Sequence, residues 1–167
     1  LEIAGCSYAG PEDALISNIS EKDIVETGKS LGKSNLTDID AALNILKYFD
    51  EPTAVVMKHN NPSGIASRNN IKDAYAAANM TDRIAAFGGV VVANRKLDKA
   101  TAEEISKSYV EVVAAPEFEK EAKGILAAKK NVRIPRRNPM SPIRLVMKAL
   151  RPASAACFFS NQNPIKK

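Results

Sequence analysis

Lys58 and His59, the only histidine of the chain, stand directly after the apolar run Ala54-Val55-Val56-Met57. An imidazole near its ordinary pKa of about 6.5 can take a proton at neutral pH, and a neighbouring ammonium can stabilise an oxyanion or protonate a leaving nitrogen. The pair therefore suits acyl or formyl transfer to a weak amine nucleophile. The plainer alternative is a surface lysine beside a capping histidine, and the chemistry of the pair alone slightly favours that alternative.

The residues after His59 decide whether the pair can act on one molecule. Neighbouring side chains of a strand point to opposite faces, so Lys58 and His59 can serve one substrate only where the backbone leaves extended geometry. The segment Asn60-Asn61-Pro62-Ser63-Gly64 places Asn, Pro and Gly at that point, which predicts a turn. Ligands of α/β proteins commonly bind where strands end, so we expect the functional site here.

Two further segments carry weaker signals for a ligand. Phe87-Gly88-Gly89 puts an aromatic face beside backbone without side chains, which suits a planar, nucleobase-like ligand. Glu111 falls on a predicted strand, where a carboxylate is more often solvated than bound to a ligand. A Gly-Gly pair before a strand is likewise most often an ordinary turn.

The elements that must position these residues alternate between helix and strand. Thr37 and Asp40 have the spacing of a capping box and predict a helix over 38–49, followed by a strand over 53–57 and a helix from 70 or 71. A β-turn-α unit is thus expected around His59. Further along, the pattern predicts strands at 90–93, 110–114 and 132–134, with helices over 101–107, capped by Asp98, and 118–130. This alternation predicts the α/β class, as a three-layer α/β/α sandwich with a mixed or mostly parallel sheet.

The 167 residues are divided unevenly in charge. The net charge is +5, but residues 122–167 hold eleven Lys and Arg and no acid. We expect an α/β body at 1–134 and a basic, Pro-containing segment of uncertain structure at 135–167, with a helix at 143–150 and a strand at 155–159. A basic tail can attract RNA or an acidic partner. Only Phe158 and Phe159 accompany its charges, so nucleic-acid binding is not the expected function.

Other classes of protein have little support in the sequence. No apolar run approaches the roughly 20 residues that a membrane span needs, and no secretory leader pattern opens the chain, so a cytoplasmic protein without a membrane segment is expected. Cys6 and Cys157 lie at opposite ends without Cys-x-x-Cys spacing, so no metal site is expected. Neither a Walker A pattern nor a Gly-x-Gly-x-x-Gly fingerprint is present.

Five ordered motifs together resemble one enzyme family. The segment 58–66, Lys-His-Asn-Asn-Pro-Ser-Gly-Ile-Ala, resembles the Lys-His-x-x-Pro-x-Gly signature of AICAR transformylase, the formyl-transferring region of the bifunctional purine-biosynthesis enzymes. The segments 35–43, 81–89, 94–98 and 110–116 match that family in order and at similar spacing. The resemblance covers the first subdomain of the transformylase region, over residues 28–134.

The resemblance implies a role for each matching position. His59 would be the general base that takes a proton from the 5-amino group of AICAR, and Lys58 would assist formyl transfer from 10-formyltetrahydrofolate, the co-substrate. Four residues match positions that contact the substrate AICAR: Asn35, Phe87, Gly88 and Glu111. The family also implies a cytidine-deaminase-like fold, without zinc because the deaminase ligand pattern is missing.

The resemblance further implies partners. Family members work as homodimers with composite sites, so a homodimer or a complementing chain is expected beside AICAR and the reduced folate. The family's Arg-Tyr-Gly segment, which holds the nucleotide phosphate, has no counterpart in residues 1–30, and the second subdomain has none as a recognisable unit. The alternative function is therefore a catalytically incomplete nucleotide-binding or interaction module of the same fold.

Overall fold

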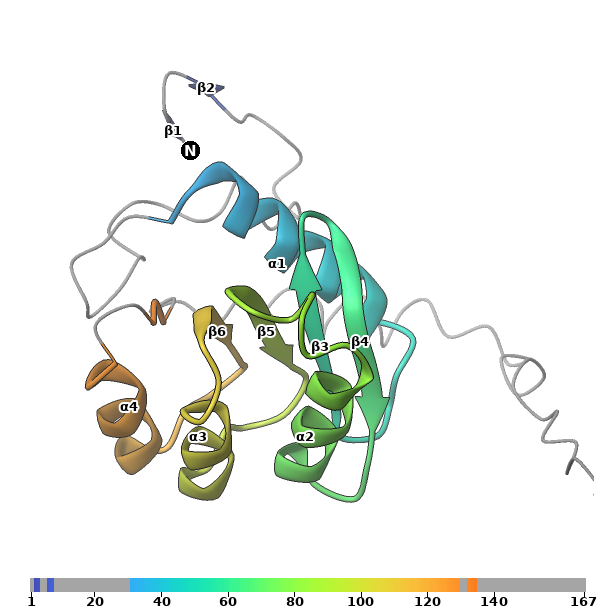
Figure 1. Ribbon diagram of the computed structural model, residues 1–167, viewed down its shortest axis with the longest axis vertical. Helices are drawn as coiled ribbons and strands as arrows, with labels where there is room; N and C mark the ends of the chain where they lie inside the picture. The colour runs from blue at the N-terminus through green and yellow to red at the C-terminus, as the bar shows by residue number, and fades with distance from the viewer. Residues whose placement is uncertain (1, 4–5, 8–30, 130–131, 135–167) are drawn as a thin grey trace, which may run out of the picture.

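The computed structural model describes residues 2–3, 6–7, 31–129 and 132–134. The body of this part is a mixed sheet covered by helices on both faces (Figure 1). The strand order is β4-β3-β5-β6, with β3 at Thr53–Lys58, β4 at Asn61–Ser67, β5 at Gly89–Ala93 and β6 at Val110–Ala114. β3 runs antiparallel to both of its neighbours, and β5 runs parallel to β6. A short antiparallel pair also joins β1 (Glu2–Ile3) to β2 (Cys6–Ser7).

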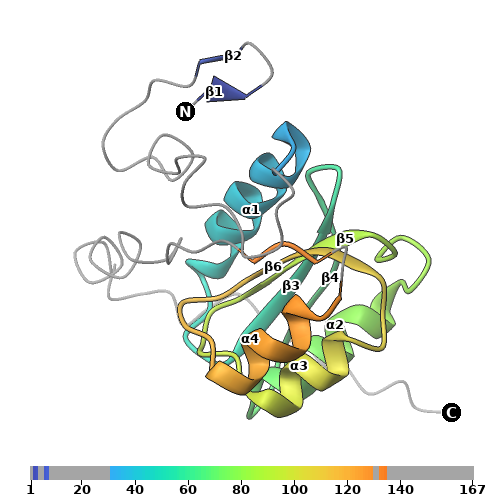
Figure 2. The ribbon, with the colours of Figure 1, turned by 90° about the vertical axis from the view of Figure 1, so that its left-hand side faces the viewer.

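Helices complete the two outer layers. α1 (Lys33–Leu46) lies on one face of the sheet, and α2 (Ile71–Thr81), α3 (Lys99–Ile105) and α4 (Lys120–Ala127) lie on the other (Figures 1 and 2). The two buried apolar clusters correspond to these two faces, one containing α1 and the other α2, α3 and α4. The predicted three-layer α/β/α sandwich with a mixed sheet is therefore confirmed. The finer assignment to a cytidine-deaminase-like fold stays a prediction.

Strand β3 is covered on both faces, which explains its continuous apolar sequence. Val55 and Met57 belong to the cluster under α1, whereas Ala54 and Val56 belong to the cluster under α2. This alternation is the ordinary two-residue period of a strand. All five residues of β5 are buried as well, as predicted for a strand without a solvated side.

The prediction of a β-turn-α unit around His59 is wrong. The residues after the turn form strand β4, which pairs with β3 from Lys58↔Asn61 to Thr53↔Ser67, so the unit is a β-hairpin followed by α2. Pro62 and Gly64, whose types predicted a turn, lie inside β4. Proline is tolerated there because β4 forms an edge of the described sheet, where a strand needs hydrogen bonds on one side only.

The predicted start of the first helix is also wrong. α1 begins at Lys33 with Gly32 as its N-cap and ends at Leu46, whereas the capping-box spacing of Thr37 and Asp40 placed it at 38–49. The Thr37 hydroxyl donates to the Ser34 carbonyl inside the helix, at 2.9 Å. A threonine can bond within a helix as well as cap one, so the spacing alone was ambiguous.

The other expected elements are found with small shifts. Asn70 caps α2 and Asp98 caps α3, each with a side-chain oxygen that accepts from the backbone three residues on. α3 ends at Ile105 and α4 begins at Lys120, two residues from the predicted bounds in each case. The predicted strand at 132–134 is reduced to a parallel bridge of Arg133 to Val112 at the side of β6.

Two predicted elements fall on residues that the structure does not describe. The helix at 143–150 and the strand at 155–159 fall in 135–167, outside the described residues, as does the expected segment boundary itself. Within the described ranges, no helix is both long and apolar enough to cross a lipid bilayer.

Gly64 shows how tightly α2 packs against β4. A Cβ added there would lie 1.9 Å from the backbone oxygen of Ala78, which cannot move without shifting the helix. We predict that Gly64→Ala lowers the free energy of unfolding by about 3 kcal/mol, because overpacking against backbone displaces the whole element. Urea denaturation of the chain would measure the loss.

Gly124 in α4 provides the matched control, since a Cβ there meets nothing within 4 Å. Gly124→Ala should stabilise the chain by up to about 1 kcal/mol through helix propensity. Equal effects of the two substitutions on unfolding would contradict the close packing of α2 on β4.

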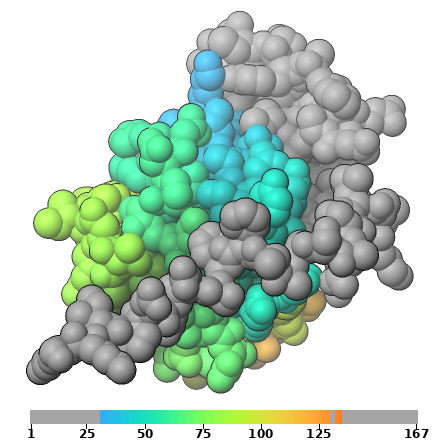
Figure 3. All heavy atoms as spheres, turned by 90° about the vertical axis from the view of Figure 1, so that its right-hand side faces the viewer, coloured from blue at the N-terminus to red at the C-terminus, as the bar shows by residue number. Residues whose placement is uncertain are grey.

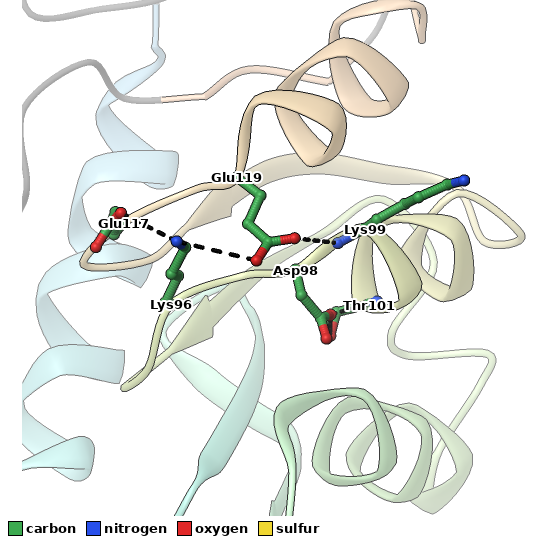
Figure 4. Close-up of polar contacts among 6 residues, drawn as sticks. All are labelled: Lys96, Asp98, Lys99, Thr101, Glu117 and Glu119. Atoms are coloured by element: carbon green, nitrogen blue, oxygen red, sulfur yellow. Dashed lines mark hydrogen bonds and ion pairs between the residues drawn. The ribbon is translucent and has the colours of Figure 1, made fainter.

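Asp98 caps α3 beside a small network of charges (Figure 4). Its Oδ1 accepts from the backbone nitrogen of Thr101 at 2.8 Å and from the Thr101 hydroxyl at 2.5 Å. Beside this cap, Lys96 pairs with Glu117 at 3.3 Å, and the Lys99 backbone nitrogen donates to Glu119. The hydrogen bond from the Thr101 side chain lowers the pKa of Asp98, because it favours the ionised carboxylate.

We predict that Asp98→Asn makes the chain less stable at neutral pH, and that this difference shrinks on acidification. A carboxyl whose pKa is lower in the folded state stabilises the fold above its unfolded pKa of about 3.9 and loses that contribution as the pH falls through its folded pKa. Urea denaturation of both proteins across this range would test the sign. Glu121→Gln, at an exposed carboxylate in the first turn of α4, is the control. A difference that grows towards acid pH would refute the assignment.

Candidate functional site

The bend that carries the Lys58-His59 pair is made by His59 and Asn60 themselves. Both have positive φ, 53° and 64°, and they form the two-residue loop between the paired residues Lys58 and Asn61. Positive φ at both central residues is the signature of a type I′ hairpin turn. The expectation that Pro62 and Gly64 make the bend is therefore wrong. A left-handed conformation costs roughly 1–2 kcal/mol in a residue that carries a Cβ, so this turn needs support from its surroundings.

Three contacts hold this hairpin. The Asn61 side chain donates to the carbonyl of His59 at 3.1 Å, and the backbone nitrogen of Asn60 donates to Oδ1 of Asp38 in α1 at 2.5 Å. Ser63 is the extra residue of a β-bulge in β4, and its hydroxyl donates to the Val56 carbonyl at 3.1 Å. Figure 3, which faces the β4 edge, shows the hairpin lying against α1.

The Lys58 side chain is held by the segment that directly precedes the neighbouring strand β5. Its Nζ donates to the carbonyl oxygens of Phe87 and Gly88, at 3.2 and 2.8 Å, just before β5 begins. An ammonium has three N–H donors, so these two bonds leave one for a ligand. The lysine is thus fixed by backbone, and its charge stays beside the Phe87-Gly88 segment.

Gly88 shapes the backbone that receives the lysine. Its φ is +68°, and a Cβ on it would lie 3.1 Å from Nζ of Lys58 and 3.3 Å from the ring of Tyr109. The Gly88 nitrogen donates to the Tyr109 carbonyl at 2.9 Å. Only glycine adopts this conformation freely, so the position both turns the chain and leaves room for the ammonium.

The Phe87 ring is available to a ligand. It is 65% exposed and stacks on Tyr109, with ring centroids 4.9 Å apart and the planes at 28°. Tyr109 was not identified from the sequence, although an aromatic residue directly before a buried strand and close to Glu111 was a usable signal. An aromatic ring with one supported face and one free face can stack on a planar heterocycle.

Asn35 and Glu111 form a second group. The Asn35 amide donates to Oε2 of Glu111 at 3.3 Å, and Arg133 lies 3.7 Å from the same carboxylate. A bulge at Glu111 explains the direction of its side chain: Gly89 pairs with Val110 and Val90 with Val112, so Glu111 is the extra residue and reaches α1. Arg133 was missed because a solvated basic stretch and a strand-edge arginine look alike in sequence.

The six predicted residues lie at one end of the sheet. The carboxyl end of β3 meets the amino end of β5 through the pairing of Met57 with Val90, and β6 begins beside β5 at Val110. The candidate site therefore lies at the carboxyl end of β3 but at the amino ends of β5 and β6, because the sheet is mixed. The structure joins Lys58 to Phe87 and Gly88, and Asn35 to Glu111. The His59 side chain is exposed and makes no hydrogen bond to another described residue.

The chain is similar to known proteins of one family over most of its length. Residues 6–163 match the family model described as AICARFT/IMPCHase bienzyme. The chain is 47% identical over 118 residues to the bifunctional purine biosynthesis protein PurH of Caldicellulosiruptor saccharolyticus, covering 71% of this chain and 23% of that protein. It is 50% and 49% identical over 107 residues to the PurH proteins of Acetivibrio thermocellus and Ruminiclostridium cellulolyticum, in each case covering 64% of the chain and 21% of the relative.

The chain thus spans less than a quarter of the length of the curated relatives that it matches. The family model covers far more than half of the chain, and the residues that it matches include the β3–β4 hairpin, Lys58 and Gly88. The chain belongs to the AICARFT/IMPCHase bienzyme family, whose relatives act in purine biosynthesis.

Proposed function

We propose that this chain supplies part of a formyl-transfer site, in which 10-formyltetrahydrofolate gives its formyl group to the 5-amino group of AICAR. One observation carries the proposal. The ammonium of Lys58, the residue before His59, is held by the carbonyl oxygens of Phe87 and Gly88. The arrangement joins a fixed positive charge, a neighbouring imidazole and an exposed aromatic ring at one end of the sheet. Membership of the family supports the choice of reaction.

The chemistry needs both a base and a cation. The 5-amino group of AICAR is a weak nucleophile because its lone pair is delocalised into the ring and the carboxamide. In the proposed step this nitrogen attacks the formyl carbon and gives a proton to His59, while the formyl oxygen becomes an oxyanion. Lys58 stabilises that charge and assists the collapse that expels N10 of the folate, which takes up, as it leaves, the proton that His59 received from the amine.

The remaining residues hold the nucleotide. The free face of Phe87 stacks on the heterocycle, and Gly88 lets the ligand approach backbone. Asn35 and Glu111 present an amide and a carboxylate, which together can bond a carboxamide or a ribose hydroxyl. Arg133 lies 3.7 Å from the Glu111 carboxylate, at the edge of β6. No metal takes part in the proposed reaction.

A second candidate function rests on the His59 side chain, which is exposed and makes no hydrogen bond to another described residue. A base that no described residue orients is consistent with a site that binds the nucleotide without catalysing the transfer. The chain would then be a nucleotide-binding module that completes a site with a second copy or with a complementing chain. This candidate keeps the affinity for AICAR but has no turnover of its own.

We predict that His59→Ala lowers the rate of formyl transfer by about 10²–10⁴-fold, the usual contribution of a general base, while AICAR affinity changes little. Lys58→Ala should lower both the rate and the affinity, since it removes a charge that is held beside the ligand. A folate-coupled absorbance assay and isothermal titration with AICAR would measure the two effects. Lys47→Ala is the matched control, because this exposed lysine bonds only Asn44 on the surface of the helix end.

The outcomes separate the two candidates. Turnover by the wild-type chain that is lost in His59→Ala supports the enzyme. AICAR binding without turnover, at every protein concentration, supports the module. Absence of AICAR binding in titrations of the wild-type chain would contradict both.

A further inference from the structure

We propose that Asp38 is a positioning residue for His59: its carboxylate holds the left-handed turn that sets the direction of the imidazole. The proposal rests on the proposed function of His59 and extends it to a helix more than twenty residues upstream. Asp38 lies in the second turn of α1, and the atom that it contacts belongs to Asn60, the second residue of the turn.

The turn contains a donor that it cannot satisfy itself. In a two-residue hairpin the bonds that close the loop join the flanking residues, here Lys58 and Asn61, so the Asn60 N–H has no partner within the hairpin. Asp38 accepts this N–H at 2.5 Å, and a hydrogen bond to an ionised acceptor is stronger than one between neutral groups. The contact thus favours the conformation in which Asn60 has positive φ.

The placement of Asp38 has no other explanation in the described residues. Its side chain is 4% exposed, yet its only hydrogen bond there goes to Asn60. It is too far into α1 to cap the helix, whose N-cap is Gly32. Burying a carboxylate away from water is unfavourable unless it is bonded, so a carboxylate kept there for one backbone amide is better explained by positioning than by stability.

His59 lies between two fixed points. On one side, Lys58 is anchored to the carbonyls of Phe87 and Gly88. On the other side, Asn60 is anchored to Asp38. With both neighbours held, the direction of the His59 Cα–Cβ bond relative to the ammonium is set by backbone, although the imidazole itself is exposed and bonded to no described residue.

The test compares Asp38→Ala with Asp40→Ala, which removes a carboxylate from the same helix where it accepts only from Asn44 at the surface. Asp38→Ala should speed hydrogen exchange of the Asn60 amide by about 10-fold or more, because the amide loses its acceptor. It should also lower kcat for formyl transfer by about 10- to 100-fold with the KM for AICAR unchanged, the pattern of a misplaced catalytic group. Asp40→Ala should leave both readouts at the wild-type level.

A glycine rescue distinguishes positioning from a general loss of structure. Glycine adopts positive φ without the clamp, so adding Asn60→Gly to Asp38→Ala should restore most of the lost kcat. A merely structural role of Asp38 predicts no such rescue. If Asp38→Ala does not fold, Asp38→Asn takes its place, with a smaller effect of the same sign because the amide oxygen is a weaker acceptor.

The exchange measurement needs no substrate, so it separates this proposal from the proposed function. Unchanged exchange of the Asn60 amide overturns the clamp whatever the enzyme does. Faster exchange with unaltered kcat in an active chain overturns the positioning role. If the wild-type chain has no turnover, the proposed function fails as an enzyme, and the exchange of the Asn60 amide still decides whether Asp38 holds the turn.

Discussion

The burial of β3 on both faces is the constraint on which the rest of the molecule depends. Every residue from Thr53 to Met57 is buried, so no side chain of β3 before Lys58, the last residue of the strand, can reach a ligand. Lys58 and His59 are the first residues at which this becomes feasible. The antiparallel pairing with β5 then brings the Phe87-Gly88 backbone to the same end, and the parallel pairing of β5 with β6 adds Glu111.

Helix α1 contacts both groups of residues at this end of the sheet. Asn35 and Asp38 are one turn apart on its buried face, and they contact different elements: Asn35 reaches Glu111 of β6, and Asp38 reaches the turn between β3 and β4. One helix face therefore connects the edge of β6 to the hairpin. A change in the packing of α1 would move both groups together, which couples the residues proposed to hold the nucleotide to the proposed base.

The sequence was sufficient to predict the three layers of the fold but not the β3–β4 hairpin. Continuous apolar runs at 54–57 and 90–93 identified the buried strands, because no other short element has that pattern. Pro62 and Gly64 predict a turn, because both residue types usually occupy turns, but here both lie in β4. In this fold the edge position of β4 tolerates the proline, and the approach of the Ala78 backbone requires the glycine. Both causes are tertiary contacts, which the local sequence does not show.

The site was predictable in composition more than in geometry. The motif order gives six candidate residues. The contacts of Lys58 with two carbonyls and of Asp38 with Asn60 depend instead on pairings between distant segments. Arg133 was not predicted from the sequence. Its contact with Glu111 depends on a β-bulge that directs the Glu111 side chain, and the sequence has no signal for this bulge.

The central claim is that the imidazole of His59 meets the AICAR molecule that lies beside Lys58. The chain has one histidine, so its imidazole nitrogens give a ¹⁵N signal that needs no assignment. We predict that this signal shifts as AICAR is added and saturates together with the signals of the bound ligand. Saturation of the chain with AICAR while the imidazole signal stays unmoved would contradict the account.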